Sequence, residues 1–169
     1  MPDINQLLSA QYLRLAIFFS VIGLLGFGYY LQYVEGFEPC ALCITQRFFL
    51  LVCGLCGLLA ALLRPALLGS RIYACVGSLL AFAGAGFSSR QLYLQSLPPG
   101  EAPACGPSVD FIFDTFPISE ALSILLRGDG NCAEVTWRFL GLSIPGWTLI
   151  DFIGLASLWL LQLRANRTA

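Results

Sequence analysis

Four of the seven cysteines in this 169-residue chain form two C-x-x-C pairs, Cys40/Cys43 and Cys53/Cys56, within the stretch EPCALCITQRFFLLVCGLC. Two thiols at this spacing can form a disulfide, exchange it with another thiol or bind a soft metal ion. The sequence contains no His, which excludes Ser-His-Asp and Cys-His nucleophile systems, His-bearing zinc sites and haem with a His ligand. The cysteines are therefore the main reactive groups of the chain.

The first pair lies at the expected beginning of a helix. Pro39 suits the first helical position, because the N–H that it lacks would have no partner there. Cys40 and Cys43 then fall in the first turn, where the positive end of the helix dipole favours the thiolate. Arg47 lies one turn deeper on the same face and could stabilise a thiolate or an anionic oxygen of a bound cofactor, unless it only reaches the lipid headgroups. This pattern favours a redox pair over a static disulfide.

The second pair repeats the spacing in a different environment. Cys53 and Cys56 are flanked by FFLLV and GLLAALL. In such an apolar run a thiolate is costly, and cysteine behaves as a small hydrophobic residue. We interpret these two cysteines as packing residues, and Cys75 in the same way.

The elements that position these cysteines are expected to be membrane-spanning helices. Hydrophobic residues make up 57% of the chain and charged residues 11%, with a mean hydropathy of +0.78, which is more apolar surface than a soluble domain of this size can bury. A span needs about 20 largely apolar residues, and four segments fit, at about 15–34, 43–63, 72–89 and 144–163. The first lacks a signal-peptide cleavage site, so we expect it to be retained. The prediction is an all-α membrane protein, a four-transmembrane-helix bundle that forms one domain over residues 1–169.

Charge bias between the loops predicts the orientation in the membrane. One side collects arginines: Arg14, Arg64, Arg71, Arg164 and Arg167. The other side collects most of the acidic residues: Glu35, Glu38, Glu101, Asp110, Asp114, Glu120, Asp129 and Glu134. Both termini are therefore expected in the cytoplasm. The outer loops, at about 35–42 and 90–143, are expected on the oxidising side, where disulfides persist.

The second outer loop is too long for a simple connector. It carries Cys105 and Cys132 in segments rich in Pro and Gly, whose backbone we expect to be mobile. Within it, PISEALSILLRG has an apolar stripe at helical spacing, formed by Ile118, Ala121, Leu122 and Leu125. This stripe predicts a short interfacial helix on the membrane surface or, equally, a loop helix packed on the spans.

Two cysteine pairs on the oxidising side of one membrane protein indicate a relay. A thiolate of a soluble partner could attack a loop disulfide, and exchange through mixed disulfides would pass the oxidation state on to Cys40 and Cys43. The electrons must then leave, and the sequence has no haem, iron–sulfur or flavin motif. A lipid-soluble acceptor that enters from the bilayer is the simplest interpretation, and a quinone fits.

Three segments closely resemble the disulfide bond formation protein B (DsbB) family. They are EPCALCITQR at the entrance of the second span, APACGPSVDF in the long loop and GNCAEVTWRFLGLSIPGW before the fourth span. The resemblance runs from about Glu38 to Trp147, and the four-span layout extends it over the chain. It implies a thiol:quinone oxidoreductase, multi-pass in the bacterial inner membrane with its active loops periplasmic. Such an enzyme reoxidises the periplasmic dithiol oxidase DsbA and so sustains disulfide bond formation.

The resemblance also implies a role for each matching residue. Cys105 would form the mixed disulfide with DsbA, and Cys132 would be its resolving partner, able to pair transiently with Cys40. The redox-active disulfides would be Cys40–Cys43 and Cys105–Cys132. Cys43 would lie next to the quinone and Arg47 would assist its reduction. The cofactor would be ubiquinone, with menaquinone as the alternative. We expect a monomer that binds membrane lipid but neither metal nor nucleic acid.

Some features do not follow the family or remain open. Family members often carry a His near the end of the third span, but this chain has QLYLQSLPPG there, so no role of that His can be transferred. A disulfide-forming protein like vitamin K epoxide reductase is a rival, although its quinone-proximal C-x-x-C lies on a later span. A metal-handling membrane protein with thiolate ligands and a bundle with inert disulfides are further alternatives. Asp151, inside the fourth span, is either a functional group such as a proton relay or part of a structural pair.

Overall fold

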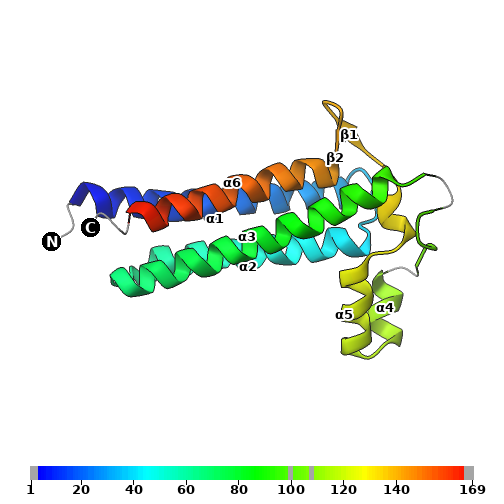
Figure 1. The fold of residues 1–169 in the computed structure, drawn as a ribbon, viewed down its shortest axis with the longest axis horizontal. Coiled ribbons are helices and arrows are strands. Elements are labelled where there is room, and N and C mark those ends of the chain that lie inside the picture. Colours follow the sequence, from blue (N-terminus) through cyan, green and yellow to red (C-terminus); the bar gives the residue numbers. More distant parts are fainter. Residues whose placement is uncertain (1–3, 99–100, 107–108, 166–169) are drawn as a thin grey trace.

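The computed structural model describes residues 4–98, 101–106 and 109–165, and four long helices form its body (Figure 1). They are α1 (Ile4–Tyr33), α2 (Ala41–Leu63), α3 (Leu67–Ser96) and α6 (Ile144–Ala165). Each contains a segment long and apolar enough to cross a membrane: Ala10–Tyr33, Ala41–Leu63, Leu67–Ser96 and Ile144–Arg164. The predicted four-helix membrane bundle is therefore confirmed. The beginning of α1 and the end of α6 lie at the same end of the bundle (Figure 1).

The helices α2 and α3 are joined by a turn of three residues. Arg64 ends α2 in the left-handed conformation, with φ 43°, and Pro65 follows, which cannot continue a helix. The helix α3 then runs for 30 residues, well past the expected span at both ends. Arg90 does not end it, because polar side chains near a helix end can remain in the headgroup region.

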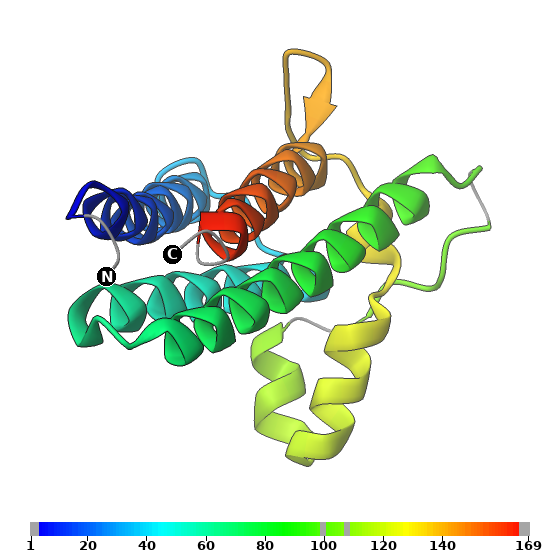
Figure 2. The ribbon, with the colours of Figure 1, turned by 60° about the vertical axis from the view of Figure 1, so that its left-hand side comes forward.

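The opposite end of the bundle carries the long loop, which is folded into several short elements. Two helices, α4 (Val109–Thr115) and α5 (Ile118–Arg127), project sideways from the bundle (Figure 2). A single turn of 3-10 helix, η1 (Gly130–Ala133), and two short strands, β1 (Arg138–Phe139) and β2 (Leu142–Ser143), lead from there to α6. The strands pair antiparallel.

The predicted loop helix forms as α5, but its apolar stripe is divided between two environments. Ala121 and Leu125 are buried, and the Thr45 hydroxyl of α2 donates to the carbonyl of Leu125 at 3.3 Å. Ile118 and Leu122 of the same stripe are exposed, at 84% and 53%. One face of α5 thus packs on the bundle, while the other remains open to the surroundings, as an interfacial helix requires.

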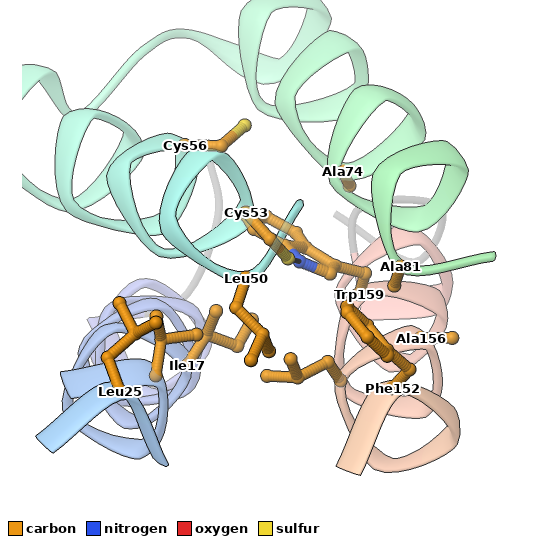
Figure 3. Packing of buried hydrophobic residues seen from close by; sticks show 12 residues of the cluster. Ile17, Leu25, Leu50, Cys53, Cys56, Ala74, Ala81, Phe152, Ala156 and Trp159 are labelled. Carbon is orange, nitrogen blue, oxygen red and sulfur yellow. Dashed lines mark hydrogen bonds between the residues drawn. The ribbon is translucent and has the colours of Figure 1, made fainter. Parts of the chain in front are cut away.

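The main core lies between the four long helices. Trp159 and Phe152 of α6 are fully buried, and they face small residues of α3 such as Ala74 and Ala81 (Figure 3). Close approach of α6 to α3 also depends on Gly77 and Gly84, because a Cβ at either position would overlap the ring of Trp159 or Phe152. Small residues of this kind commonly allow tight helix packing in membranes.

A buried cation ties the helices together at the end away from the loop. Arg14 of α1 is only 6% exposed. Its Nη1 donates to the carbonyl of Ala60 in α2 at 2.9 Å, and its Nη2 donates to the Ser70 hydroxyl of α3 at 2.6 Å. The amide oxygen of Gln162 in α6, turned toward the guanidinium, accepts from Nε at 2.8 Å. One arginine therefore links all four helices.

Candidate functional site

The first C-x-x-C pair lies at the beginning of α2. Cys40 is the N-cap residue, with φ −75° and ψ 171°, and the helix proper begins at Ala41. Pro39 therefore precedes the N-cap and does not occupy the first helical position expected from the sequence. The sulfurs of Cys40 and Cys43 are 3.1 Å apart, because an N-cap residue and the third residue of the first turn lie on the same side of a helix start.

A third cysteine joins this pair from the long loop. The Cys40 thiol makes hydrogen bonds to both Cys132 and Cys43, and these contacts, together with burial, raise the pKa of Cys40 above its usual value. The Cys40 sulfur thus lies between two possible partners, one on its own helix and one in the loop. All seven cysteines are thiols in the structure.

Cys132 is held in this position by packing on the ends of α2 and α3. It is fully buried in a second apolar cluster with Ala41, Leu42, Leu94 and Leu125. The hydrogen bond from Cys40 lowers the pKa of Cys132, and hydrogen bonds from the backbone of Leu42 and Asp129 act in the same direction. Unpaired N–H groups in the first turn of a helix commonly stabilise an anion in this way. The site therefore favours the thiolate on Cys132 and the thiol on Cys40.

Cys105 has a different environment. Its side chain is exposed, while the backbone on either side of it accepts hydrogen bonds from the segment around η1. The amide of Gly130 donates to the carbonyl of Ala104 at 3.1 Å, and Asn131 Nδ2 donates to the carbonyl of Gly106 at the same distance. No disulfide or hydrogen bond joins the sulfurs of Cys105 and Cys132 within the described parts of the chain. Their pairing stays a prediction.

Arg47 is bound to α1, and it does not extend freely to the membrane surface. Its Nη2 donates to the carbonyl of Gly28 at 2.9 Å, and its Nη1 donates to Gln32 Oε1. The guanidinium also lies 5.0 Å from the centre of the Tyr29 ring, within the range of a cation–π contact. These contacts fix the cation one turn below Cys43.

A cavity of about 340 Å³ lies next to the two sulfurs. Residues of α1, α2, α3 and α6 and of the segment after Cys132 line it, among them Leu31, Cys40, Cys43, Arg47, Trp137 and Asp151. Most of the lining is apolar, with a few polar groups among it, as is typical of sites for small organic molecules. Asp151 also lies on this wall, and its role, functional or structural, stays a prediction.

Two glutamines were not singled out from the sequence, yet they contact the site directly. Gln91 Nε2 lies 3.3 Å from the Cys40 sulfur and 3.4 Å from the Cys43 sulfur. Gln46 Nε2 donates to Gln91 Oε1 at 2.7 Å. The signal that could have found them is the presence of uncharged polar residues beside the helix start and at the end of the third span.

The second C-x-x-C pair lies inside the bundle. The indole of Trp159 donates to the Cys53 sulfur (Figure 3), and the Cys56 thiol lies 3.7 Å from the carbonyl of Tyr73. Both cysteines are buried in the apolar core, in keeping with a packing role. Cys75 is exposed on the outer face of α3, so the packing role expected for it is not seen. Among residues 4–98, 101–106 and 109–165, no group of three His, Cys, Asp or Glu side chains could hold a metal ion.

Fold and site together define a multi-pass membrane protein with a cluster of cysteines where one helix begins. A model of the family described as Disulfide bond formation protein DsbB matches residues 10–162. The relative named Disulfide bond formation protein B in Hahella chejuensis is 50% identical over 142 residues, 84% of this chain and 86% of that protein. Proteins of the same name in Saccharophagus degradans and Nitrosococcus oceani are 48% and 45% identical over 92% and 90% of this chain, and 93% and 91% of their own lengths. The chain belongs to the DsbB family, and it is an oxidoreductase of disulfide bond formation.

Proposed function

We propose that this protein reoxidises a periplasmic dithiol oxidase of the DsbA type and passes the electrons to a quinone of the bacterial inner membrane. The observation that carries the proposal is the position of the Cys40 sulfur, which contacts Cys43 at 3.1 Å and also Cys132. A cysteine between two partners can exchange a disulfide from one to the other.

Electrons would enter at Cys105. Its exposed sulfur is accessible to a soluble protein, whereas the Cys132 sulfur is fully buried. A thiolate of the partner would attack Cys105 in a Cys105–Cys132 disulfide. The new S–S bond would join the partner to Cys105, and the electron pair of the broken bond would remain on Cys132. The second thiol of the partner would then displace Cys105, so that the partner leaves with its own disulfide.

Transfer to the membrane pair would follow at Cys40. The hydrogen bond from the Cys40 thiol, which lowers the pKa of Cys132 most, exists only while Cys40 is reduced, but the backbone hydrogen bonds of Leu42 and Asp129 lower this pKa as well. These backbone donors remain when Cys40 is in a disulfide, and they favour the displaced sulfur as the attacking thiolate. Its attack on the Cys40–Cys43 disulfide would form a Cys40–Cys132 bond and leave the electron pair on Cys43. Return of Cys105 to Cys132 would then release Cys40 as the second reduced cysteine.

The cavity beside Cys43 fits a quinone head group. Its walls are mostly apolar, its volume is about 340 Å³, and the Arg47 cation is held in its wall by α1. Arg47, Cys43 and the apolar side chains of α1 and α2 would hold the group. When bound, the quinone would accept two electrons and two protons, which balances the two thiols that the partner loses. Ubiquinone is the proposed acceptor, and menaquinone is its alternative.

The experiment is quinone reduction by the purified protein with reduced DsbA, run separately with ubiquinone and menaquinone. Cys→Ser variants at Cys40, Cys43, Cys105 and Cys132 should each abolish turnover, whereas Cys53→Ser, Cys56→Ser and Cys75→Ser should retain it. Full activity of Cys43→Ser would refute the route. Oxidation of DsbA without quinone reduction would instead favour a different acceptor.

A further inference from the structure

A chain of three polar side chains, one from each of three helices, ends on the two sulfurs of the C-x-x-C pair. The Thr148 hydroxyl of α6 donates to Gln46 Oε1 of α2 at 2.7 Å, and Gln46 Nε2 donates to Gln91 Oε1 of α3 at 2.7 Å. The two glutamines are almost fully buried, at 2% and 3% exposure. Hydrogen bonds of uncharged side chains across helices are common in membrane bundles. Here the last side chain of the series, Gln91, also contacts the sulfurs of Cys40 and Cys43.

The Thr148 hydroxyl also lies 3.1 Å from the Pro145 carbonyl and 3.1 Å from the Ser88 hydroxyl, but its shortest contact is with Gln46 Oε1, at 2.7 Å. Donation along this shortest contact sets the direction of the other links. A hydroxyl proton directed at Gln46 Oε1 turns the Gln46 NH₂ group toward Gln91, and the oxygen of Gln91 must then face Gln46. The NH₂ group of Gln91 is left to face the sulfurs of Cys40 and Cys43, at 3.3 and 3.4 Å. The Gln91 oxygen is more distant from Cys43, at 3.8 Å. An amide that could otherwise take either orientation thus presents two N–H donors to the pair.

We propose that Gln91 is a catalytic residue that donates hydrogen bonds to the negative charge released when the Cys40–Cys43 disulfide opens, and that Gln46 and Thr148 are positioning residues that orient its amide. The proposal rests on the proposed function, since it assigns redox chemistry to this pair. In the step concerned, the Cys132 thiolate forms a bond to Cys40, the Cys40–Cys43 bond breaks, and its electron pair stays on Cys43. No proton moves in this step, so the new charge must be stabilised by fixed donors.

The consequence is a more oxidising cysteine pair. A hydrogen bond to an ionised sulfur is about twice as strong as one to a neutral acceptor, whereas a disulfide sulfur is only a weak acceptor. Donors at this position therefore stabilise the reduced form more than the disulfide. Loss of them should favour the disulfide by about tenfold in the exchange equilibrium, which is about 30 mV for two electrons.

The test measures that equilibrium in the full-length protein without partner or quinone. Cys105→Ser and Cys132→Ser leave Cys40 and Cys43 as the only redox pair of the proposed route. The purified protein is equilibrated in glutathione buffers of known potential, its thiols are trapped with a maleimide, and the reduced fraction is determined by mass spectrometry of the peptide that carries both cysteines.

Gln91→Met keeps the length of the side chain but removes its donors, and it should shift the equilibrium toward the disulfide by about tenfold. Thr148→Val removes only the hydroxyl that orients Gln46, and it should shift the equilibrium in the same direction by a smaller factor. Thr148→Ser retains the hydroxyl and should restore the original value. Gln95→Met is the matched control one turn further along α3, where the amide accepts from the Ser143 hydroxyl at 2.7 Å and contacts no cysteine.

An unchanged equilibrium in Gln91→Met, or equal values for Thr148→Val and Thr148→Ser, would overturn the proposal. If Gln91→Met does not fold, the two Thr148 variants decide the question alone. The readout also separates this inference from the proposed function. A shifted equilibrium in a protein that reduces no quinone would sink the proposed function only, and an unshifted one in an active enzyme would sink this inference only.

Discussion

The indole Nε1 of Trp159 donates a hydrogen bond to the Cys53 sulfur, 3.2 Å away, in the centre of the bundle. This contact distinguishes the two C-x-x-C pairs of the chain. Cys53 is a fixed acceptor for a buried donor, while Cys40 lies at the beginning of its helix between two other cysteines. Equal spacing therefore supports structure in one pair and, we propose, exchange in the other.

Substitution of Cys53 should affect stability and not turnover. Cys53→Ala leaves the Trp159 N–H without an acceptor and opens a small space in the core, which should cost about 1–2 kcal/mol. The measurement is thermal unfolding of the purified protein beside quinone reduction. Cys75→Ala, on the exposed face of α3, is the control and should change neither quantity. Loss of turnover in a folded Cys53→Ala protein would contradict the packing role.

The reactivity of Cys132 should depend on Cys40. In the reduced protein the hydrogen bond from Cys40 lowers the pKa of Cys132, so its reactive thiolate is present at lower pH than for an ordinary thiol. Cys40→Ala removes this donor, and the pH profile of Cys132 alkylation should move to higher pH. Cys43→Ala keeps the donor and should leave the profile in place. The profile is measured by mass spectrometry after short pulses of iodoacetamide, and identical profiles for the two variants would disprove the dependence.

Two replacements of Arg47 should distinguish the effect of its charge on quinone turnover from the effect of its planar geometry. Arg47→Met removes the cation from the cavity and should lower quinone turnover by about a hundredfold. Arg47→Lys keeps the charge but loses the planar group that donates to Gly28 and Gln32, and a loss of about tenfold is expected. The rate constant and KM for quinone are measured for each variant. Arg138→Gln, on the exposed strand β1, is the matched control, and wild-type rates in Arg47→Met would leave Arg47 only an anchoring role.

Arg14 should stabilise the fold without affecting the chemistry. Arg14→Met would leave the buried Ser70 and Gln162 without the guanidinium that they share, at a cost of about 2 kcal/mol. Because Arg14 lies at the opposite end of the bundle from Cys40 and Cys43, the redox equilibrium of this pair should not change. Thermal unfolding and the glutathione equilibrium test the two halves of this prediction. A shifted equilibrium would show that the two ends of the bundle are coupled.

The presence and approximate bounds of the four long helices could be predicted from the sequence, and so could the presence of α5. Long apolar runs have few alternatives to spanning helices, and the apolar stripe of Ile118, Ala121, Leu122 and Leu125 was enough to place a helix in the loop. The depth of the cysteines followed from these runs. Cys53 and Cys56 were correctly assigned to the apolar interior because their neighbours in sequence are hydrophobic on both sides.

The contacts between helices could not be predicted in this way. Arg14 looked like a charge at the edge of a span, but it is buried, because its partners come from three other helices. Gln91 was not singled out, because its importance depends on Gln46 and Thr148, which are remote in the sequence and adjacent only after the helices pack. Periodicity indicates that a face is apolar but does not identify its neighbour.

The length of α3 has a consequence for how the two reactants meet this protein. Its 30 residues rise about 45 Å, whereas the hydrocarbon core is about 30 Å thick. Gln91, close to the end of α3, therefore lies near the boundary between lipid and water. A quinone would reach Cys43 by lateral diffusion in the plane of the membrane. A soluble partner would reach Cys105 by diffusion through the aqueous phase. The rates of these two encounters can therefore be varied independently, the first by the quinone content of the bilayer and the second by the concentration of the partner.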